Sequence, residues 1–186
     1  YVLKLLLYLY EEIKDWINLI NLLPAIKKIK LISDTDFLRK QQHAYLQQLG
    51  SFIKQGDPNR IDDFYKEIPK DLRNDASINA CFAKYLITKD RHKEAEGILR
   101  KQLAREVEDI LLELYAKIAP KFVNLNYIES LYKNNKSVTV SLCLGKICMS
   151  KKLWGKAEKY LQESIGITPS KDAYVALGLL FEQEHK

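Results

Sequence analysis

The sequence is poor in the residues that interrupt regular structure, with 7 glycines and 5 prolines among 186 residues. So few turn formers in a chain of this length favour long helices with short connections over many strands. The glycine-rich phosphate loops GxGxxG and GxxxxGK[ST] are missing, and so are the HExxH and GxSxG motifs of hydrolases. We therefore expect an all-α protein that is not an enzyme.

Metal-ligating residues are also scarce. The three histidines, at positions 43, 92 and 185, are scattered without ligand spacing, and the three cysteines do not form a disulfide framework. Cys143 and Cys148 are five residues apart, about 140° around a helix, so they cannot easily hold one ion. Because cysteine is a good small hydrophobe in helical cores, we predict structural roles for both, no metal site, and a reducing compartment.

No apolar run is long enough to cross a membrane. In the opening stretch "YVLKLLLYLYEEIKDWINLINLLP" the longest run is Leu5–Tyr10, whereas a spanning helix needs about 20 mostly apolar residues. The stretch also has no small-residue cleavage site of a signal peptide. It predicts an amphipathic helical hairpin with Asp15 and Trp16 near the turn. Because the chain starts with Tyr1 rather than Met, we expect it to be a piece of a longer protein.

What the sequence does contain is a repeat. Leu144-Gly145 returns 33 residues later as Leu177-Gly178, Ala157 follows Gly145 by twelve residues, and Pro169 follows it by 24. This is the spacing of a tetratricopeptide repeat, a pair of helices A and B about 34 residues long. Small residues are needed where helices A and B cross closely. Pro169 ends helix B, and Ser170 is a candidate cap for the next helix.

The same frame extends toward the N-terminus. Ala83 and Ala95 are twelve residues apart, and Ala116 follows Ala83 by 33, which gives a series of small residues at 83, 116, 145 and 178. We predict tetratricopeptide-like repeats over residues 76–183, preceded by two divergent helix pairs at 1–30 and 34–68. The second pair should meet at a turn over residues 56–58. Without any Gly-rich or Ser-rich linker, residues 1–186 form one predicted solenoid domain of ten to eleven helices.

The functional surface of such a solenoid is its concave face. The residues just after the small ones are Lys84, Lys117, Lys146 and Leu179. We predict that the three lysines form a basic strip for an acidic peptide or a C-terminal carboxylate, with apolar pockets from nearby side chains (Ile87, Leu142 and Met149). The alternative is that these lysines are ordinary solvated residues.

Two stretches resemble the HemY family of Gram-negative bacteria. The segment "EEIKDWINLINLLPAIKKIKLIS" resembles that family's "gDW..L..LLP.L.K...L" segment, through Asp15-Trp16, Leu22-Leu23-Pro24 and Lys28, with Lys14 where the family has Gly. The segment "AEKYLQESIGITPSKDAYVALGLLFEQ" resembles the family's C-terminal repeat. The resemblance implies an inner-membrane protein with a membrane hairpin upstream and this domain on the cytoplasmic side. It also implies a scaffold for enzymes of late haem biosynthesis.

Other functions stay open at this point. The net charge of +6 permits nucleic acid, an anionic membrane surface or an acidic protein as partner. A helical-repeat protein that reads RNA needs base-reading side chains at fixed repeat positions, which are irregular here, so we expect no nucleic acid. A different tetratricopeptide chaperone or adaptor is the main alternative. Direct haem or porphyrin binding is another, although His92 and Cys81 belong to no CxxCH motif.

Overall fold

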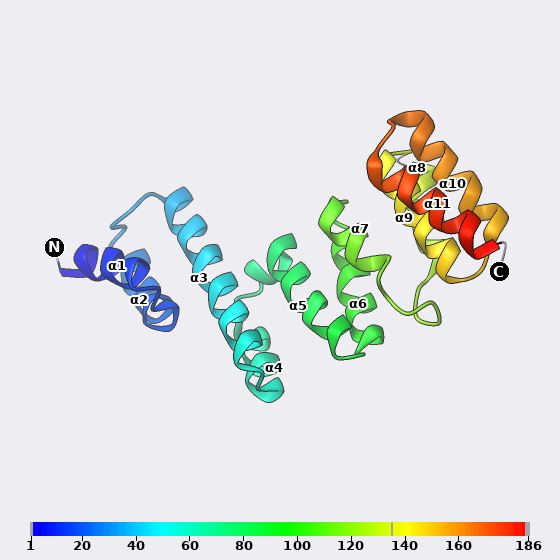
Figure 1. Ribbon diagram of the computed structural model, residues 1–186. Helices are drawn as coiled ribbons and strands as arrows, with labels where there is room; N and C mark the ends of the chain where they lie inside the picture. Colours follow the sequence, from blue (N-terminus) through cyan, green and yellow to red (C-terminus); the bar gives the residue numbers. More distant parts are fainter. Residues whose placement is uncertain (1, 135, 185–186) are drawn as a thin grey trace. The chain divides into compact units, whose positions relative to one another are not determined.

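The computed structural model describes residues 2–134 and 136–184. Throughout this part of the chain the regular structure is helical, with eleven α-helices, one short 3-10 helix and no strand (Figure 1). The predicted all-α class and helix number are therefore confirmed. The chain divides into two compact units, Tyr1–Tyr85 and Leu86–Lys186. That these units form one domain stays a prediction.

The helices follow one another in pairs, joined by short connections. The first unit holds α1 (Val2–Glu12), α2 (Trp16–Lys28), α3 (Asp34–Gln55), α4 (Pro58–Glu67), the 3-10 helix η1 (Leu72–Asn74) and most of α5 (Ala76–Thr88). The second unit holds α6 (His92–Leu103), α7 (Asp109–Tyr115), α8 (Leu125–Asn134), α9 (Val138–Ser150), α10 (Trp154–Ile167) and α11 (Lys171–Glu184). Within the residues that the structure describes, none of these helices is long and apolar enough to cross a membrane.

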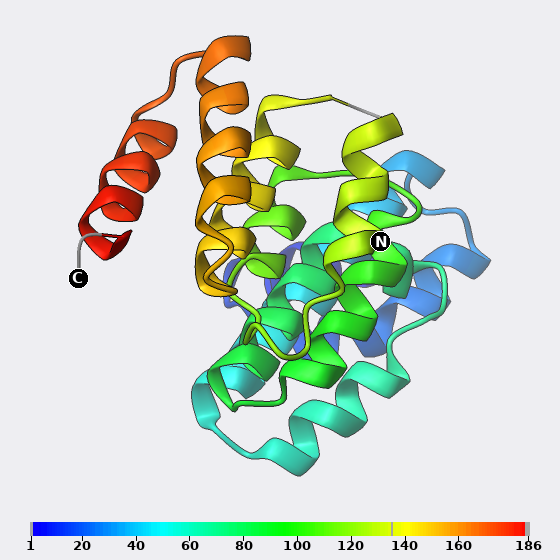
Figure 2. The ribbon, with the colours of Figure 1, turned by 90° about the vertical axis from the view of Figure 1, so that its right-hand side faces the viewer.

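In the second unit α10 packs against both α9 and α11, and Figure 2 shows α10 and α11 side by side. Their common core is a cluster of buried apolar side chains, namely Cys148, Ala157, Leu161, Ala176 and Leu180. The helices α9 and α10 approach closely at Gly145. A Cβ placed on this glycine would lie 2.5 Å from Cδ2 of Leu161, which is fully buried. Glycine at this position is what allows the two helices to pack.

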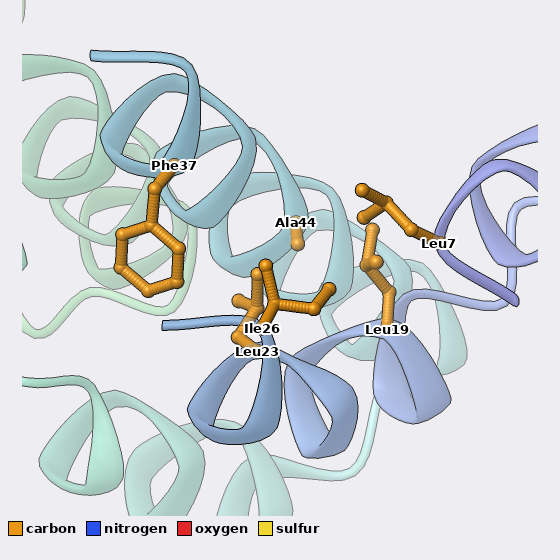
Figure 3. Close-up of a cluster of buried hydrophobic side chains, with 6 residues drawn as sticks. All are labelled: Leu7, Leu19, Leu23, Ile26, Phe37 and Ala44. Carbon is orange, nitrogen blue, oxygen red and sulfur yellow. The ribbon is translucent and has the colours of Figure 1, made fainter. Parts of the chain in front are cut away.

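The core of the first unit joins α1, α2 and α3 (Figure 3). It is a cluster of six buried side chains, Leu7, Leu19, Leu23, Ile26, Phe37 and Ala44. Two polar features hold these helices in place. Asp15 caps α2 by accepting a hydrogen bond from the Asn18 N–H at 3.2 Å, and a half-buried ion pair of 2.6 Å joins Glu11 of α1 to Lys40 of α3. The predicted hairpin with Asp15 at its turn is thus formed by α1 and α2.

Four of the five helix pairs have a left-handed residue at the same place in the turn. A residue with positive φ stands two positions before the second helix in each, and these residues are Lys14 (φ 57°), Gly56 (φ 82°), Asp90 (φ 57°) and Lys152 (φ 58°). In three of them the next N–H donates to the carbonyl five residues back, each at 2.9 Å (Asp15 to Tyr10, Arg91 to Leu86, Leu153 to Cys148). This is the Schellman-type helix end, whose left-handed residue is usually glycine. Only one of the four is glycine, so the sequence did not reveal the regularity.

The last connection matches the expectation from Pro169. Thr168 before it is extended, with φ −152° and ψ 116°, which ends α10. Ser170 caps α11, because its hydroxyl accepts the Ala173 N–H at 3.2 Å.

Candidate functional site: a groove along α7, α9 and α11

Two of the three predicted lysines line a single groove of about 550 Å³ in the second unit. Lys117 and Lys146 share it with Met149 and Leu179, which were also predicted to contribute. The remaining lining residues are Glu113, Ala116, Ser150, Asp172, Val175, Ala176 and Gln183. The groove therefore follows α7 and α9, the first helices of the last two pairs, and the final helix α11, and α9 contacts both of the others.

Helix spacing explains why these side chains meet. Lys146 and Met149 are three residues apart on α9, and Val175 and Leu179 are four apart on α11, so each pair shares one helix face. Lys117 lies in the turn just after α7.

Hydrogen bonds fix the end of α7 that presents Lys117. The buried Tyr115 hydroxyl donates to Glu96 Oε1 at 2.9 Å and accepts the Asn124 N–H at 3.4 Å. Burial and the bond to Glu96 raise the pKa of Tyr115 well above its ordinary value, so the hydroxyl keeps the proton that it donates. The turn that carries Lys117 is therefore anchored to α6.

The groove has an apolar floor that is open to solvent. Val175 and Leu179 are 52% and 47% exposed, and Met149 is half-buried beside them. Exposed apolar side chains in a concave surface favour the binding of another apolar group. Leu142, also predicted, lines a smaller cavity of about 30 Å³ that shares Glu113, Ala116 and Lys146 with the groove.

The charges of the groove are mixed rather than purely basic. Glu113 and Asp172 line it together with Lys117 and Lys146. None of the four forms an ion pair with another residue of the described chain. Sequence reasoning missed both carboxylates, although Glu113 precedes Lys117 by four residues, a spacing that places two side chains on the same side of a helix.

The other predicted residues have the following positions. Lys84 is exposed on α5 and belongs to the first unit, so its place along the predicted lysine strip stays a prediction. Of the repeat signature, Ala83, Ala95, Leu144, Gly145 and Ala157 are buried, Ala116 and Leu177 are half-buried, and Pro169 and Gly178 are exposed.

The cysteines of α9 are core residues. Cys143 and Cys148 are both buried, and the Cys143 thiol donates to the Leu112 carbonyl at 3.3 Å. Burial raises the pKa of the Cys143 thiol to about 12 and that of the Cys148 thiol to about 11. Both therefore stay protonated at neutral pH, and a protonated thiol is neither a nucleophile nor a metal ligand.

No three His, Cys, Asp or Glu side chains of the described chain lie close enough to hold a metal ion. His92, considered above for haem, already accepts the Ala119 N–H on Nδ1 at 3.4 Å and lies against Phe122. Cys81 is half-buried on α5, and His185 lies outside the described residues.

The arrangement as a whole is suited to binding. It combines an apolar floor, four charges that form no ion pair within the part of the chain that the structure describes, and a volume in the range of ligand pockets. Comparison with known proteins gives no match to a family model, to a curated protein or to a solved structure.

Proposed function

We propose that this protein is a non-enzymatic binding module that holds a segment of a partner protein in the groove of α7, α9 and α11. One observation supports the proposal most directly. Exposed apolar side chains, and four charges that form no ion pair within the described residues, gather along α7, α9 and α11. A groove that follows successive helix pairs suits an extended or helical peptide, which is long and narrow in the same way.

The proposed architecture is a tetratricopeptide-like solenoid. Two features support it beyond the sequence spacing. Gly145 lies where α9 and α10 approach closely, as the small residue of such a repeat should, because a Cβ added to it would lie 2.5 Å from Cδ2 of Leu161. The same left-handed turn, with its hydrogen bond to the carbonyl five residues back, also precedes α2, α6 and α10, which is a regularity expected of a repeated unit.

The side chains that line the groove limit the kind of peptide that it can bind. Met149, Val175 and Leu179 suit an apolar anchor side chain, and Lys117 and Lys146 suit an acidic group beside it. Glu113 and Asp172 would repel a uniformly acidic segment. We therefore propose a peptide with an apolar anchor and only one or two acidic groups, which is narrower than the acidic peptide or C-terminal carboxylate that the lysines alone suggested.

The narrower proposal is a HemY-like scaffold that docks enzymes of haem biosynthesis at the bacterial inner membrane, with this part of the protein on the cytoplasmic side. It rests on the motif around Asp15 and Trp16. One structural detail supports it: Lys14, where the family has Gly, adopts φ 57°, a conformation that favours glycine. The motif also has a packing role, since the Trp16 ring meets His43 edge-on at 5.1 Å.

The test is affinity purification with the full chain as bait. The variant carries Lys117→Glu and Lys146→Glu, and the control carries the same change of charge at Lys93 and Lys101 on α6. Lys93 and Lys101 are exposed like Lys117, whereas Lys146 is half-buried. We expect partners that are captured by the parent and the control to be lost from the groove variant, with the helical signal unchanged. Recovery of the same partners by all three proteins would contradict the proposal. Haem-biosynthesis enzymes among the lost partners would support the narrower proposal.

A further inference from the structure

Beside the groove lies a second, more open hollow of about 500 Å³. It is formed by the connection between α7 and α8 and by the connection between α9 and α10, and we call it the lysine shelf. Its lining residues are Pro120, Lys121, Ser150, Lys151, Lys152 and Leu153. Ser150, the last residue of α9, lines both the groove and the shelf, so the shelf continues the groove at this end of α9.

Contacts between the two connections hold the shelf in shape. The Lys151 ammonium group donates a hydrogen bond to the Pro120 carbonyl and so ties one connection to the other. Lys121 Nζ lies 4.9 Å from the centre of the Phe122 ring. That ring stacks on His92 at the start of α6, with 6.2 Å between the ring centres. Two of the three lysines of the shelf are therefore positioned by defined contacts.

The charge of the shelf is positive only. No carboxylate is found among the described residues that line it, and its three lysines form no ion pair within the described chain. The neighbouring sequence is equally one-sided, because Glu129 is the only acidic residue between Glu113 and Glu158. Glu129 is already paired with Lys156 at 3.0 Å. The sequence around the shelf therefore supplies no unpaired carboxylate to its lysines.

The carboxylates of the groove lie toward its opposite end. Glu113 and Asp172 also line the smaller cavity, together with Thr139 and Leu142. Thr139 and Asp172 are the second residues of α9 and α11, whereas Ser150 is the last residue of α9. The groove and the shelf together therefore run from an acidic end, where α9 and α11 begin, to a basic end beyond α9.

We propose that the lysine shelf binds a short run of Asp or Glu residues that belongs to the same partner segment whose apolar anchor occupies the groove. This inference rests on the function proposed above. The acidic run lies beyond Ser150, and the uncharged or basic end of the segment lies beside Glu113 and Asp172. Because the three ammonium groups come from separate points of two connections, they suit several successive acidic side chains better than one anion.

The test measures the affinity of the full chain for peptides selected on it from a random displayed library. Each selected peptide is extended by four aspartates or by four serines, first at one end and then at the other. At one of the two ends the aspartates should tighten binding about tenfold over the serines, because three exposed charge pairs contribute roughly twofold each. At about 1 M salt this gain should fall below about twofold, since exposed charges are then screened beyond about 3 Å.

The shelf variant carries Lys121→Gln and Lys152→Gln, and one remaining lysine should leave a gain of only about twofold. The matched control carries the same substitution at Lys101 on α6 and Lys133 on α8. These two lysines are exposed and line neither the groove nor the shelf. The control loses the same net charge, so it should keep the tenfold gain, and melting curves should show both proteins folded.

Equal affinities for the two extensions, or a gain that the control loses as well, would overturn the shelf proposal and leave the groove proposal standing. A gain that the shelf variant keeps would have the same meaning, and a simultaneous loss of its binding to phosphatidylglycerol vesicles would assign the shelf to a membrane surface. The groove proposal fails by a different result. If the variant with Lys117→Glu and Lys146→Glu binds the serine-extended peptides as tightly as the parent, both proposals are overturned.

Discussion

Two glycines with the same sequence signature have opposite surroundings. Gly145 on α9 and Gly178 on α11 each follow a leucine and stand 33 residues apart. A Cβ at the first would lie 2.5 Å from Leu161, whereas a Cβ at the second would lie in open space. The signature therefore marks a place in the helix pair where another helix can approach, and it does not show whether one does. Substitutions at these glycines and at the residues around them test this difference.

The largest effect should come from the side chain that fills the space over Gly145. Leu161 is fully buried, so Leu161→Ala should leave a cavity and lower the free energy of unfolding by about 2–5 kcal/mol. Its control on α11 is Leu179→Ala, which removes a side chain that is 47% exposed and should change the stability by only about 0.5 kcal/mol. Urea unfolding measures both. Equal losses would contradict the packing described for α9 and α10.

The second effect concerns the covered glycine itself. Gly145→Ala should lower the free energy of unfolding by about 1–2 kcal/mol, because overpacking against Leu161 outweighs the better helix propensity of alanine. The measurement is again urea unfolding, with the slope checked against that of the parent. A stability equal to or above the parent's would mean that α10 does not approach α9 closely at this point.

The third effect has the opposite sign. Gly178→Ala should raise the free energy of unfolding by about 0.5–1 kcal/mol, because alanine is the better helix former and its Cβ meets no neighbour. The melting temperature, measured at a low protein concentration, should rise accordingly. A loss of stability here would show that α11 is covered at this face.

The smallest effect concerns the turn that brings α10 onto α9. Lys152 adopts φ 58°. This conformation raises the free energy of a residue with a side chain by about 1–2 kcal/mol, whereas it is nearly free of strain for glycine. Glycine is also more flexible in the unfolded chain, which offsets part of this gain. The net effect of Lys152→Gly should be to raise the free energy of unfolding by about 0.5 kcal/mol. The control is Lys159→Gly within α10, which should instead lower the free energy of unfolding by about 1 kcal/mol. A destabilised Lys152→Gly variant in thermal melts would contradict the left-handed turn.

Local patterns in the sequence predicted much of the fold. The scarcity of glycine and proline indicated helices, and Ser170 and the residues around Pro58 marked helix ends, because caps and prolines act on their immediate neighbours. The left-handed turns at Lys14, Asp90 and Lys152 were not predicted, since lysine and aspartate carry no mark of positive φ. In each of them the following N–H donates to the carbonyl five residues back, a hydrogen bond that closes the turn.

The groove was predicted only in part. Counting from the small residues identified Lys117, Lys146, Met149 and Leu179, which do lie together. The same count could not reveal Asp172, because its place in the groove depends on how α11 lies against α9 and not on a position after a small residue. Only the structure therefore shows that the groove carries both positive and negative charges.

The central claim is that the groove binds a peptide, and a single methyl group in the groove can report on it. The sequence holds a single methionine, Met149, and it lines the groove. A protein labelled with ¹³C at the methionine methyl gives one reporter signal there. The peptides to titrate are those selected on the protein from a random displayed library. We predict that they shift this signal, that they carry an apolar residue next to an acidic one, and that the variant with Lys117→Glu and Lys146→Glu binds them weakly. Selected peptides that bind tightly and leave the Met149 signal unchanged would contradict the account.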